Sequence, residues 1–155
     1  MELINAREME LLPIKETSVE NAELIRDPLC GETISMTIDF YKKVGFVQPW
    51  IGYLAKQNDD LVGAAGFKGP PINGMVEIAY GTFEKFQKQG IGTAICKQLV
   101  ELSLMTDPSV KISARTLPEK NFSTRILEKN NFIFKGTVND PEDGEVWEWV
   151  FEGNQ

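Results

Sequence analysis

Residues Gln87-Lys88-Gln89-Gly90-Ile91-Gly92-Thr93 follow a strand-like run and open a helix-like one. A strand, a glycine-containing turn and a helix N-terminus together make an anion site, because the first helical turn leaves backbone N–H groups without partners and the helix dipole favours negative charge. Glycine also lets a phosphate approach those donors closely. The stretch therefore predicts a phosphate-bearing ligand, and an ordinary helix start is the structural alternative.

Several classes of chemistry are excluded or disfavoured by what the sequence lacks. The loop fits neither Gly-x-x-x-x-Gly-Lys-Ser/Thr nor Gly-x-Gly-x-x-Gly, which disfavours nucleotide hydrolysis and dinucleotide redox chemistry. The sequence contains no histidine, which excludes Ser-His and Cys-His catalysis and ordinary zinc sites, so no metal is expected. Lys and Arg number 16 against 23 Asp and Glu, a net charge of -7 without a basic run, so nucleic acid is not an expected partner.

The sequence also predicts the setting of the protein. Its first residues lack the basic start and apolar run of a signal peptide, and no window is long enough for a membrane span. We therefore expect a cytoplasmic protein that does not associate with membranes. Of the two cysteines, Cys96 lies in a helical apolar pattern, which favours a small buried residue over a nucleophile or a disulfide.

The pattern along the chain predicts a single α/β domain over residues 1–155. Ile91, Ile95, Leu99 and Leu102 recur at helical spacing and mark one buried face. A short apolar run at residues 110–114 predicts a central strand covered on both faces. Helices are expected over residues 17–26 (with Ser18 as N-cap), 32–44, 90–105 and 122–129, and strands over 9–14, 50–56, 61–68, 75–82, 110–114, 132–136 and 145–151.

Five ordered segments carry a resemblance to a known family. They are LVGAAGFKGPP (61–71), VEIAYG (76–81), the glycine loop (87–93), ARTLPE (114–119) and NFSTRILEKNNF (121–132). Together they resemble the GCN5-related N-acetyltransferase (GNAT) superfamily, in the branch that contains the ribosomal-protein-alanine N-acetyltransferases. The resemblance implies a mixed, mostly antiparallel twisted sheet of about seven strands flanked by about four helices. It also implies transfer of an acetyl group from acetyl-CoA directly to a primary amine, on a small molecule or a protein N-terminus.

The resemblance implies which residues hold acetyl-CoA. In relatives the glycine loop binds the pyrophosphate, the end of the preceding strand contacts the pantetheine, and an asparagine before the last helix contacts the same arm. Asn121 also fits a simple helix N-cap, and Lys120 occupies the alternative position for the family asparagine. The positions carried over are Gly81, Thr82, Gln87, Lys88, Gln89, Gly90, Ile91, Gly92, Thr93, Asn121 and Ser123.

Amine acetylation needs a general base, and Glu77 is the first candidate. Alternation along residues 76–80 puts this carboxylate in an otherwise apolar strand beside the glycine loop, where burial would raise its pKa toward the useful range. In relatives a glutamate at this place is often assigned to the base or to a base-linked water. The structural alternative is a Glu on a solvated face or paired with a Lys or Arg.

Ser123 and Tyr80 compete as the proton donor to the thiolate leaving group. Many relatives carry a tyrosine on the last helix, at the position of Leu127 here. Ser123 fits the serine of the ribosomal-protein branch and also fits a helix cap, whereas Tyr80 also fits a core aromatic. Because Leu127 replaces the tyrosine, a non-catalytic acyl-CoA-binding or regulatory module remains the alternative function.

The acceptor side is less defined by the sequence. The amine is expected to approach among the first two helices and the loop over residues 137–144, whose Asp140, Glu142 and Asp143 either attract a cationic amine or form a solvated acidic turn. The protein is expected to be a monomer or a homodimer. A structural homodimer built on the Trp147 and Trp149 strand is a further alternative.

Overall fold

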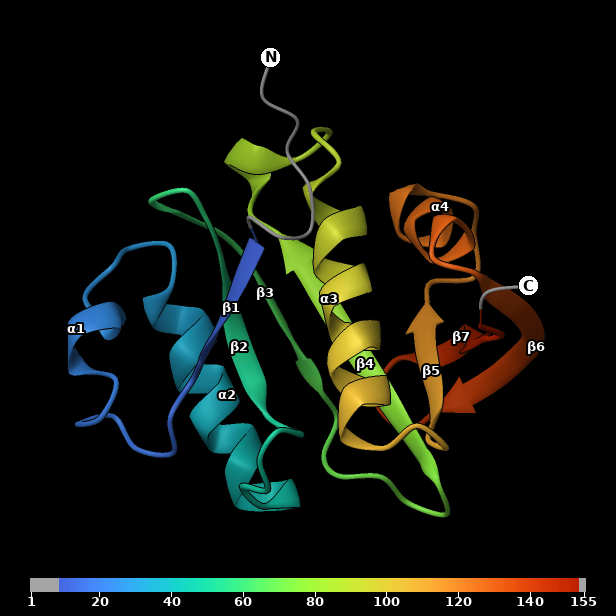
Figure 1. The fold of residues 1–155 in the computed structure, drawn as a ribbon, viewed down its shortest axis with the longest axis horizontal. Coiled ribbons are helices and arrows are strands. Elements are labelled where there is room, and N and C mark those ends of the chain that lie inside the picture. Colours follow the sequence, from blue (N-terminus) through green and yellow to red (C-terminus); the bar gives the residue numbers. More distant parts are fainter. Residues whose placement is uncertain (1–8, 154–155) are drawn as a thin grey trace.

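The structure, a computed structural model, describes residues 9–153. In that range, strands and helices follow one another in the order shown in Figure 1. The strands are β1 (Met9–Pro13), β2 (Gly52–Gln57), β3 (Asp60–Phe67), β4 (Met75–Thr82), β5 (Lys111–Thr116), β6 (Phe132–Asp140) and β7 (Gly144–Phe151). The helices are α1 (Ala22–Ile25), α2 (Gly31–Val44), α3 (Ile91–Thr106) and α4 (Phe122–Lys129), with a short 3-10 turn, η2 (Glu84–Phe86), before α3.

The strands form one seven-stranded sheet in the order β1-β2-β3-β4-β5-β7-β6. Only β4 and β5 run parallel, and every other neighbouring pair is antiparallel. A parallel pair needs a crossover connection, which α3 supplies here. The predicted mixed, mostly antiparallel sheet is confirmed, and β5 is central, as its apolar sequence predicted.

Different helices cover the two faces of this sheet. A Cβ atom built on Gly52 of β2 would lie 2.6 Å from the Thr37 side chain, so this face of β2 packs against α2. A Cβ atom on Gly63 of β3 would lie 3.0 Å from the Ile95 side chain, so the opposite face packs against α3. Figure 1 shows α3 in front of β4, with α4 beside it.

The register assigns each β4 side chain to one of these faces. Gly66 of β3 pairs with Gly52 on one side and with Ala79 on the other, so these three residues share the α2 face. Because side chains alternate along a strand, Glu77 also lies on the α2 face and Tyr80 lies on the α3 face. The two catalytic candidates in β4 therefore point to opposite sides of the sheet.

The predicted apolar face of α3 is confirmed. Ile91, Ile95 and Leu99 are buried, and Leu102 packs against the same core. Burial of aliphatic side chains at this spacing removes a continuous stripe of apolar surface from water and fixes α3 on the sheet.

The helix predicted over residues 17–26 is much shorter in the structure. Only Ala22–Ile25 is helical, and Ser18 caps nothing. The reason is the buried side chain of Asn21, which accepts a hydrogen bond from the Lys15 backbone N–H at 2.9 Å and donates one to the Lys15 carbonyl oxygen at 2.9 Å. These bonds stabilise a turn in competition with helix.

The prediction of a loop over residues 137–144 is also wrong. β6 continues to Asp140 and β7 begins at Gly144, which leaves a tight turn of Pro141, Glu142 and Asp143. The Asp140 carboxylate accepts hydrogen bonds from the backbone N–H groups of Glu142 and Asp143, at 2.9 and 3.1 Å. The side chain of Asp140 therefore organises the turn.

A structural homodimer built on the Trp147 and Trp149 strand stays a prediction, but β7 offers no free edge for pairing with a second chain. β7 lies between β5 and β6, so both of its edges are already paired. Trp149 is buried, and its Nε1–H donates a hydrogen bond to Thr116 Oγ1 at 3.1 Å. Within residues 9–153, no helix is long and apolar enough to cross a bilayer.

We expect Gly63→Ala to destabilise the fold by about 1–3 kcal/mol, because the new methyl group would collide with the Gly81 carbonyl oxygen and crowd Thr82 Cα at 3.2 Å. Neither backbone atom can move without disturbing the β3–β4 ladder. The matched control is Gly81→Ala, where an added Cβ meets nothing within 4 Å. Urea unfolding of the two variants checks the difference, and equal midpoints would contradict it.

Candidate active site

The site is built around a separation of the two parallel strands. β4 pairs with β5 only from Met75 to Ile78, opposite Lys111 to Ala114. Beyond Ile78, β4 stays paired with β3 as far as Thr82, while β5 stays paired with β7 as far as Thr116. The two strands therefore diverge into a fork.

The predicted anion site lies at the open end of this fork. Gly90 is the N-cap of α3 with φ 80°, a left-handed conformation that favours glycine, and it has no side chain to cap the helix. Lys88 in the same loop also has a positive φ of 65°. The Gln87 side chain donates a hydrogen bond from Nε2 to the Thr82 carbonyl oxygen at 3.2 Å, which ties the loop to β4.

Gly92, in the first turn of α3, has a packing role. A Cβ atom at this position would lie 2.6 Å from Ile126 Cδ1 on α4 and 3.3 Å from Thr82 Oγ1 on β4. The absence of a side chain lets α3, α4 and the end of β4 meet closely. This contact holds the two helices that flank the fork against each other.

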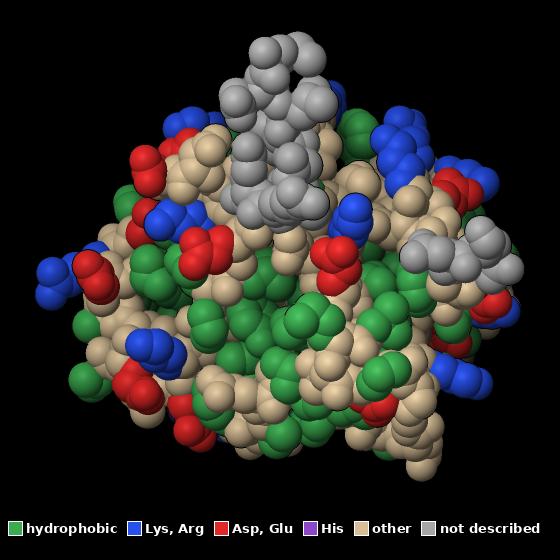
Figure 2. Space-filling model, in the orientation of Figure 1, with side chains coloured by type: hydrophobic (Ala, Val, Ile, Leu, Met, Phe, Trp, Pro, Cys, Tyr) green, Lys and Arg blue, Asp and Glu red, His purple; other side chains and the backbone are tan. Residues whose placement is uncertain are grey.

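Two cations lie on an exposed aromatic ring at the entrance to this region. Lys88 Nζ lies 5.6 Å from the centroid of the Phe122 ring, and the Arg125 guanidinium carbon lies 5.4 Å from it. Figure 2 shows Lys and Arg side chains gathered over the upper edge of α4. Arg125 was missed from the sequence, because its nearness to Lys88 depends on how α4 docks on α3.

Asn121 has the structural role that the sequence left open. Its side-chain oxygen accepts a hydrogen bond from the Thr124 backbone N–H at 3.1 Å, and Thr124 Oγ1 accepts one from the Asn121 N–H at 3.0 Å. This reciprocal pair is a capping box at the start of α4. At the other end of α4, Asn131 has φ 67°, a left-handed conformation that asparagine tolerates after a helix.

The structure brings the two candidate proton donors together. The Tyr80 hydroxyl reaches from β4 to the Ser123 carbonyl oxygen on α4, at 3.4 Å, whereas Ser123 is itself exposed. Burial raises the pKa of Tyr80 above its ordinary value, and the adjacent Cys96 thiol adds to this effect. The phenol therefore stays protonated near pH 7 and can donate a hydrogen bond.

Leu127 and the two cysteines are not themselves candidates for proton transfer or nucleophilic attack. Leu127 is fully buried in the core. Burial raises the pKa of the Cys96 thiol to about 12 and that of Cys30 to about 11, so neither thiol ionises near neutral pH. The prediction of Cys96 as a small buried residue is confirmed.

Glu77 lies on the opposite face of β4, in a mixed environment. Its carboxylate oxygens are 3.9 Å from Lys68 Nζ and 3.9 Å from Arg115 Nε, and its side chain is 23% exposed. Burial raises the pKa of Glu77 above its ordinary value, while the charges of Lys68 and Arg115 act in the opposite direction. The carboxylate therefore combines partial desolvation with two nearby cations, as the sequence alternatives separately suggested.

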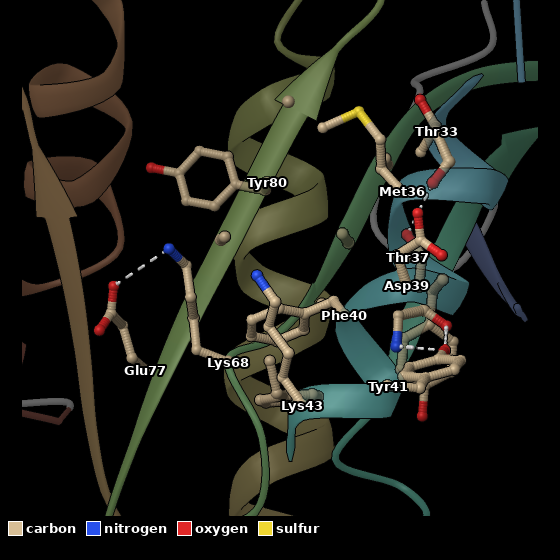
Figure 3. A pocket seen from close by; sticks show the side chains of 18 of the residues that line it. Thr33, Met36, Thr37, Asp39, Phe40, Tyr41, Lys43, Lys68, Glu77 and Tyr80 are labelled. Carbon is tan, nitrogen blue, oxygen red and sulfur yellow. Dashed lines mark hydrogen bonds and ion pairs between the residues drawn. The ribbon is translucent and has the colours of Figure 1, made fainter. Parts of the chain in front are cut away.

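A cleft of about 710 Å³ opens in front of Glu77, between α2 and the sheet. Its floor includes Ala79, Tyr80 and Gly81 of β4, so it reaches the fork. Figure 3 shows Met36 and Lys43 projecting from α2 toward β4, and Lys68 extending to Glu77. The other charged side chains that line the cleft are Asp39, Asp140 and Glu142.

A network of charges behind Glu77 was missed from the sequence. Arg115 donates hydrogen bonds to Asp140 at 2.9 Å and to Glu148 at 3.4 Å, so that β5 is linked to β6 and β7. The pKa of Asp140 is lowered to about 2, by the backbone N–H groups of its turn and then by Arg115. Alternation in β5 could have assigned Arg115 to the Glu77 face, but its partners on β6 and β7 depend on the strand order.

Comparisons with known proteins agree with this geometry. The profile of the acetyltransferase (GNAT) domain family matches residues 15–133. No curated protein sequence matched the chain.

Solved acetyltransferases share the fold at low sequence identity. The RimL ribosomal L7/L12 alpha-N-protein acetyltransferase in complex with coenzyme A has a TM-score of 0.67 at 17% identity, covering 92% of this chain and 93% of that one. A spermidine N-acetyltransferase SpeG chimera from Vibrio cholerae and hSSAT has a TM-score of 0.68 at 11% identity, covering 93% and 95%. The AAC(6')-Ib structure with paromomycin and acetyl-CoA has a TM-score of 0.67 at 23% identity, covering 93% of both chains.

The family profile spans most of the chain, and the sheet, the fork and the glycine-capped α3 agree with it. The resemblance, fold and activity predicted from the sequence are thereby confirmed. The chain belongs to the GNAT acetyltransferase family and is an N-acetyltransferase that uses acetyl-CoA to acetylate amines.

Proposed function

We propose that the two faces of β4 divide the reaction between a base and an acid. Glu77, on the α2 face, takes the proton of the acceptor amine, and Tyr80, on the α3 face, gives a proton to the sulfur. The observation that carries this proposal is the register of β4, which turns the two side chains to opposite sides at the same fork. Acetyl-CoA supplies the activated acyl group as the thioester substrate.

The proposed transfer balances in protons and bonds. The amine nitrogen attacks the thioester carbonyl carbon, a C–N bond forms, and the C–S bond breaks as the tetrahedral species collapses. The proton lost by nitrogen goes to the Glu77 carboxylate directly or through one water, and the Tyr80 hydroxyl donates its proton to the leaving sulfur. The thiol and the amide are the products.

Tyr80 is preferred to Ser123 as the acid because of where the two hydroxyl groups lie. Its hydroxyl points from β4 to the Ser123 carbonyl oxygen on α4, so it lies between β4 and α4. The Ser123 side chain is exposed at the surface of α4. The alternative of a non-catalytic module rested on the replacement of a family tyrosine by Leu127. Tyr80 supplies a phenol from β4 and so weakens that alternative.

We further propose that acetyl-CoA lies along the fork, with its pyrophosphate at the N-terminus of α3. The residues carried over from the family support this, since Gly81 and Thr82 end β4 at the open side of the fork. Gly90 supplies an N-cap without a side chain, which leaves the first backbone N–H groups of α3 open to a phosphate. Lys88 and Arg125 add positive charge at the same entrance.

The proposed acceptor is a primary amine on a molecule that carries further positive charge. The cleft is lined by four carboxylates and two lysines, together with apolar side chains such as Met36 and Phe40. Its volume of about 710 Å³ suits a small molecule better than a flat protein surface. Spermidine and paromomycin, named for two proteins of the same fold, have this chemistry. The expectations of a cytoplasmic location and of a monomer or homodimer stay predictions.

Binding of the cofactor is tested by thermal unfolding. Acetyl-CoA or CoA at about 100 times its dissociation constant should stabilise the protein by roughly 2.7 kcal/mol and raise the melting temperature by several degrees. ATP at the same concentration should not. Lys88→Gln should reduce the shift, because it removes a cation from the entrance. An unchanged melting temperature with both acetyl-CoA and CoA would contradict the proposed binding of the cofactor along the fork.

The base and the acid are distinguished by pH profiles of kcat/KM. Glu77→Gln should lower kcat/KM by about 10²-fold or more and abolish the rise of activity with pH, because a raised pKa makes the carboxylate available only as pH increases. Tyr80→Phe should lower the plateau and keep the rise. An unchanged profile in Glu77→Gln would exclude Glu77 as the base.

The acceptor class is tested by thiol release from acetyl-CoA with three probes. These are spermidine, paromomycin and a short peptide with a free N-terminal alanine. We expect faster transfer to the two polycations, with a KM that rises with salt because exposed charges are screened. Transfer confined to the peptide would contradict a cationic small-molecule acceptor.

A further inference from the structure

Arg115 stands at the point where the fork opens. Ala114 is the last β5 residue paired with β4, and Arg115 is the next. Since Glu77 lies opposite Ser113 in the parallel register, Arg115 is on the same face as Glu77, one residue pair further along. Its side chain can therefore act on Glu77 from within the sheet, without occupying the cleft.

The guanidinium offers a different nitrogen to each of three carboxylates. Nη1 lies 2.9 Å from Asp140 Oδ2, Nη2 lies 3.4 Å from Glu148 Oε2, and Nε lies 3.9 Å from Glu77 Oε1. These partners come from β6, β7 and β4. The planar fork of arginine presents these three nitrogens at fixed, separate positions, whereas lysine offers a single nitrogen on a flexible stem.

The unequal distances matter for the chemistry. Asp140 and Glu148 accept hydrogen bonds and anchor the guanidinium, whereas the contact with Glu77 is an ion pair without a hydrogen bond. Among the described residues, Arg115 Nε is a buried donor without a hydrogen-bond partner. Positive charge therefore stabilises the Glu77 carboxylate while the oxygen lone pairs stay free to accept a proton.

The charges around Glu77 do not balance. Among residues 9–153, the ion pairs of the three carboxylates Glu77, Asp140 and Glu148 involve two cations, Arg115 and Lys68. Lys68 is 44% exposed, so Arg115, at 28%, is the more buried of the two. The other charged side chains that line the cleft are Asp39 and Lys43 from α2 and Glu142 from the β6–β7 turn.

We propose that Arg115 is the positioning residue of this active site, held by Asp140 and Glu148 so that it keeps Glu77 ionised and oriented but free to accept a proton. The proposal rests on the assignment of Glu77 as the base. It makes four strands, β4, β5, β6 and β7, contribute to one proton transfer, although only Glu77 touches the reacting amine.

The test follows the titration of Glu77 itself, by ¹³C NMR of the full-length protein labelled at the glutamate carboxyl carbon. Glu77→Gln identifies the resonance. In Arg115→Gln the Glu77 midpoint should rise by about one pH unit, because a cation is lost. In Glu148→Gln it should fall by less, because an anion is lost. Lys135→Gln, which removes a cation paired with Glu152 at 3.2 Å elsewhere, is the matched control and should leave the midpoint unchanged.

A conservative variant keeps the proposal testable if Arg115→Gln does not fold. Arg115→Lys should keep the Glu77 midpoint within a few tenths of a pH unit but lower kcat/KM about tenfold, since a single nitrogen on a flexible stem does not reproduce the fixed positions of the three guanidinium nitrogens. Full activity in Arg115→Lys, or an unchanged midpoint in folded Arg115→Gln, would overturn the positioning role. If Glu77→Gln keeps full activity while the midpoints move as described, the base assignment fails instead.

Discussion

The separation of β4 from β5 after Ile78 and Ala114 is the constraint on which the rest of the site depends. Two parallel strands that stay paired would fill this part of the sheet with their own hydrogen bonds. Here each strand instead follows its outer neighbour, β4 with β3 and β5 with β7. Backbone groups along the inner edges are therefore left for a ligand, since buried N–H and C=O groups need partners.

Side-chain contacts hold the far side of this opening in place. Thr116 accepts a hydrogen bond from Trp149, and Arg115 is tied to Asp140 and Glu148, so the end of β5 is bound to β6 and β7. On the near side, Gln87 ties the glycine loop to Thr82. The opening is thus a supported feature of the fold.

Much of this could be predicted from the sequence, because the signals are local. The helical spacing of Ile91, Ile95 and Leu99 predicted α3. The bounds of β4 and α4 agree with the expected ranges. The glycine loop and the alternation around Glu77 supplied the two groups of residues on which the proposed site rests. Five described segments, read together, were enough to indicate the family.

The remainder depends on contacts between segments that are distant along the chain. The short α1 follows from one buried asparagine, Asn21, whose hydrogen bonds favour a turn that propensity does not reveal. The extended β6 follows from its pairing with β7, and the grouping of Arg115 with Asp140 and Glu148 requires the strand order β5-β7-β6. A single sequence, without the fold, does not indicate any of these partners.

The close contact at Gly92 separates what can vary in this enzyme from what cannot. Because Gly92 of α3 has no side chain, Ile126 of α4 packs directly against the first turn of α3, and the two helices that flank the fork meet closely. Across the sheet, α2 presents exposed residues such as Met36 and Asp39 to the cleft. In the proposed arrangement the amine enters on this side, so substitutions on α2 change amine recognition without altering the helices that flank the fork, and new acceptor specificities are accessible by small evolutionary steps.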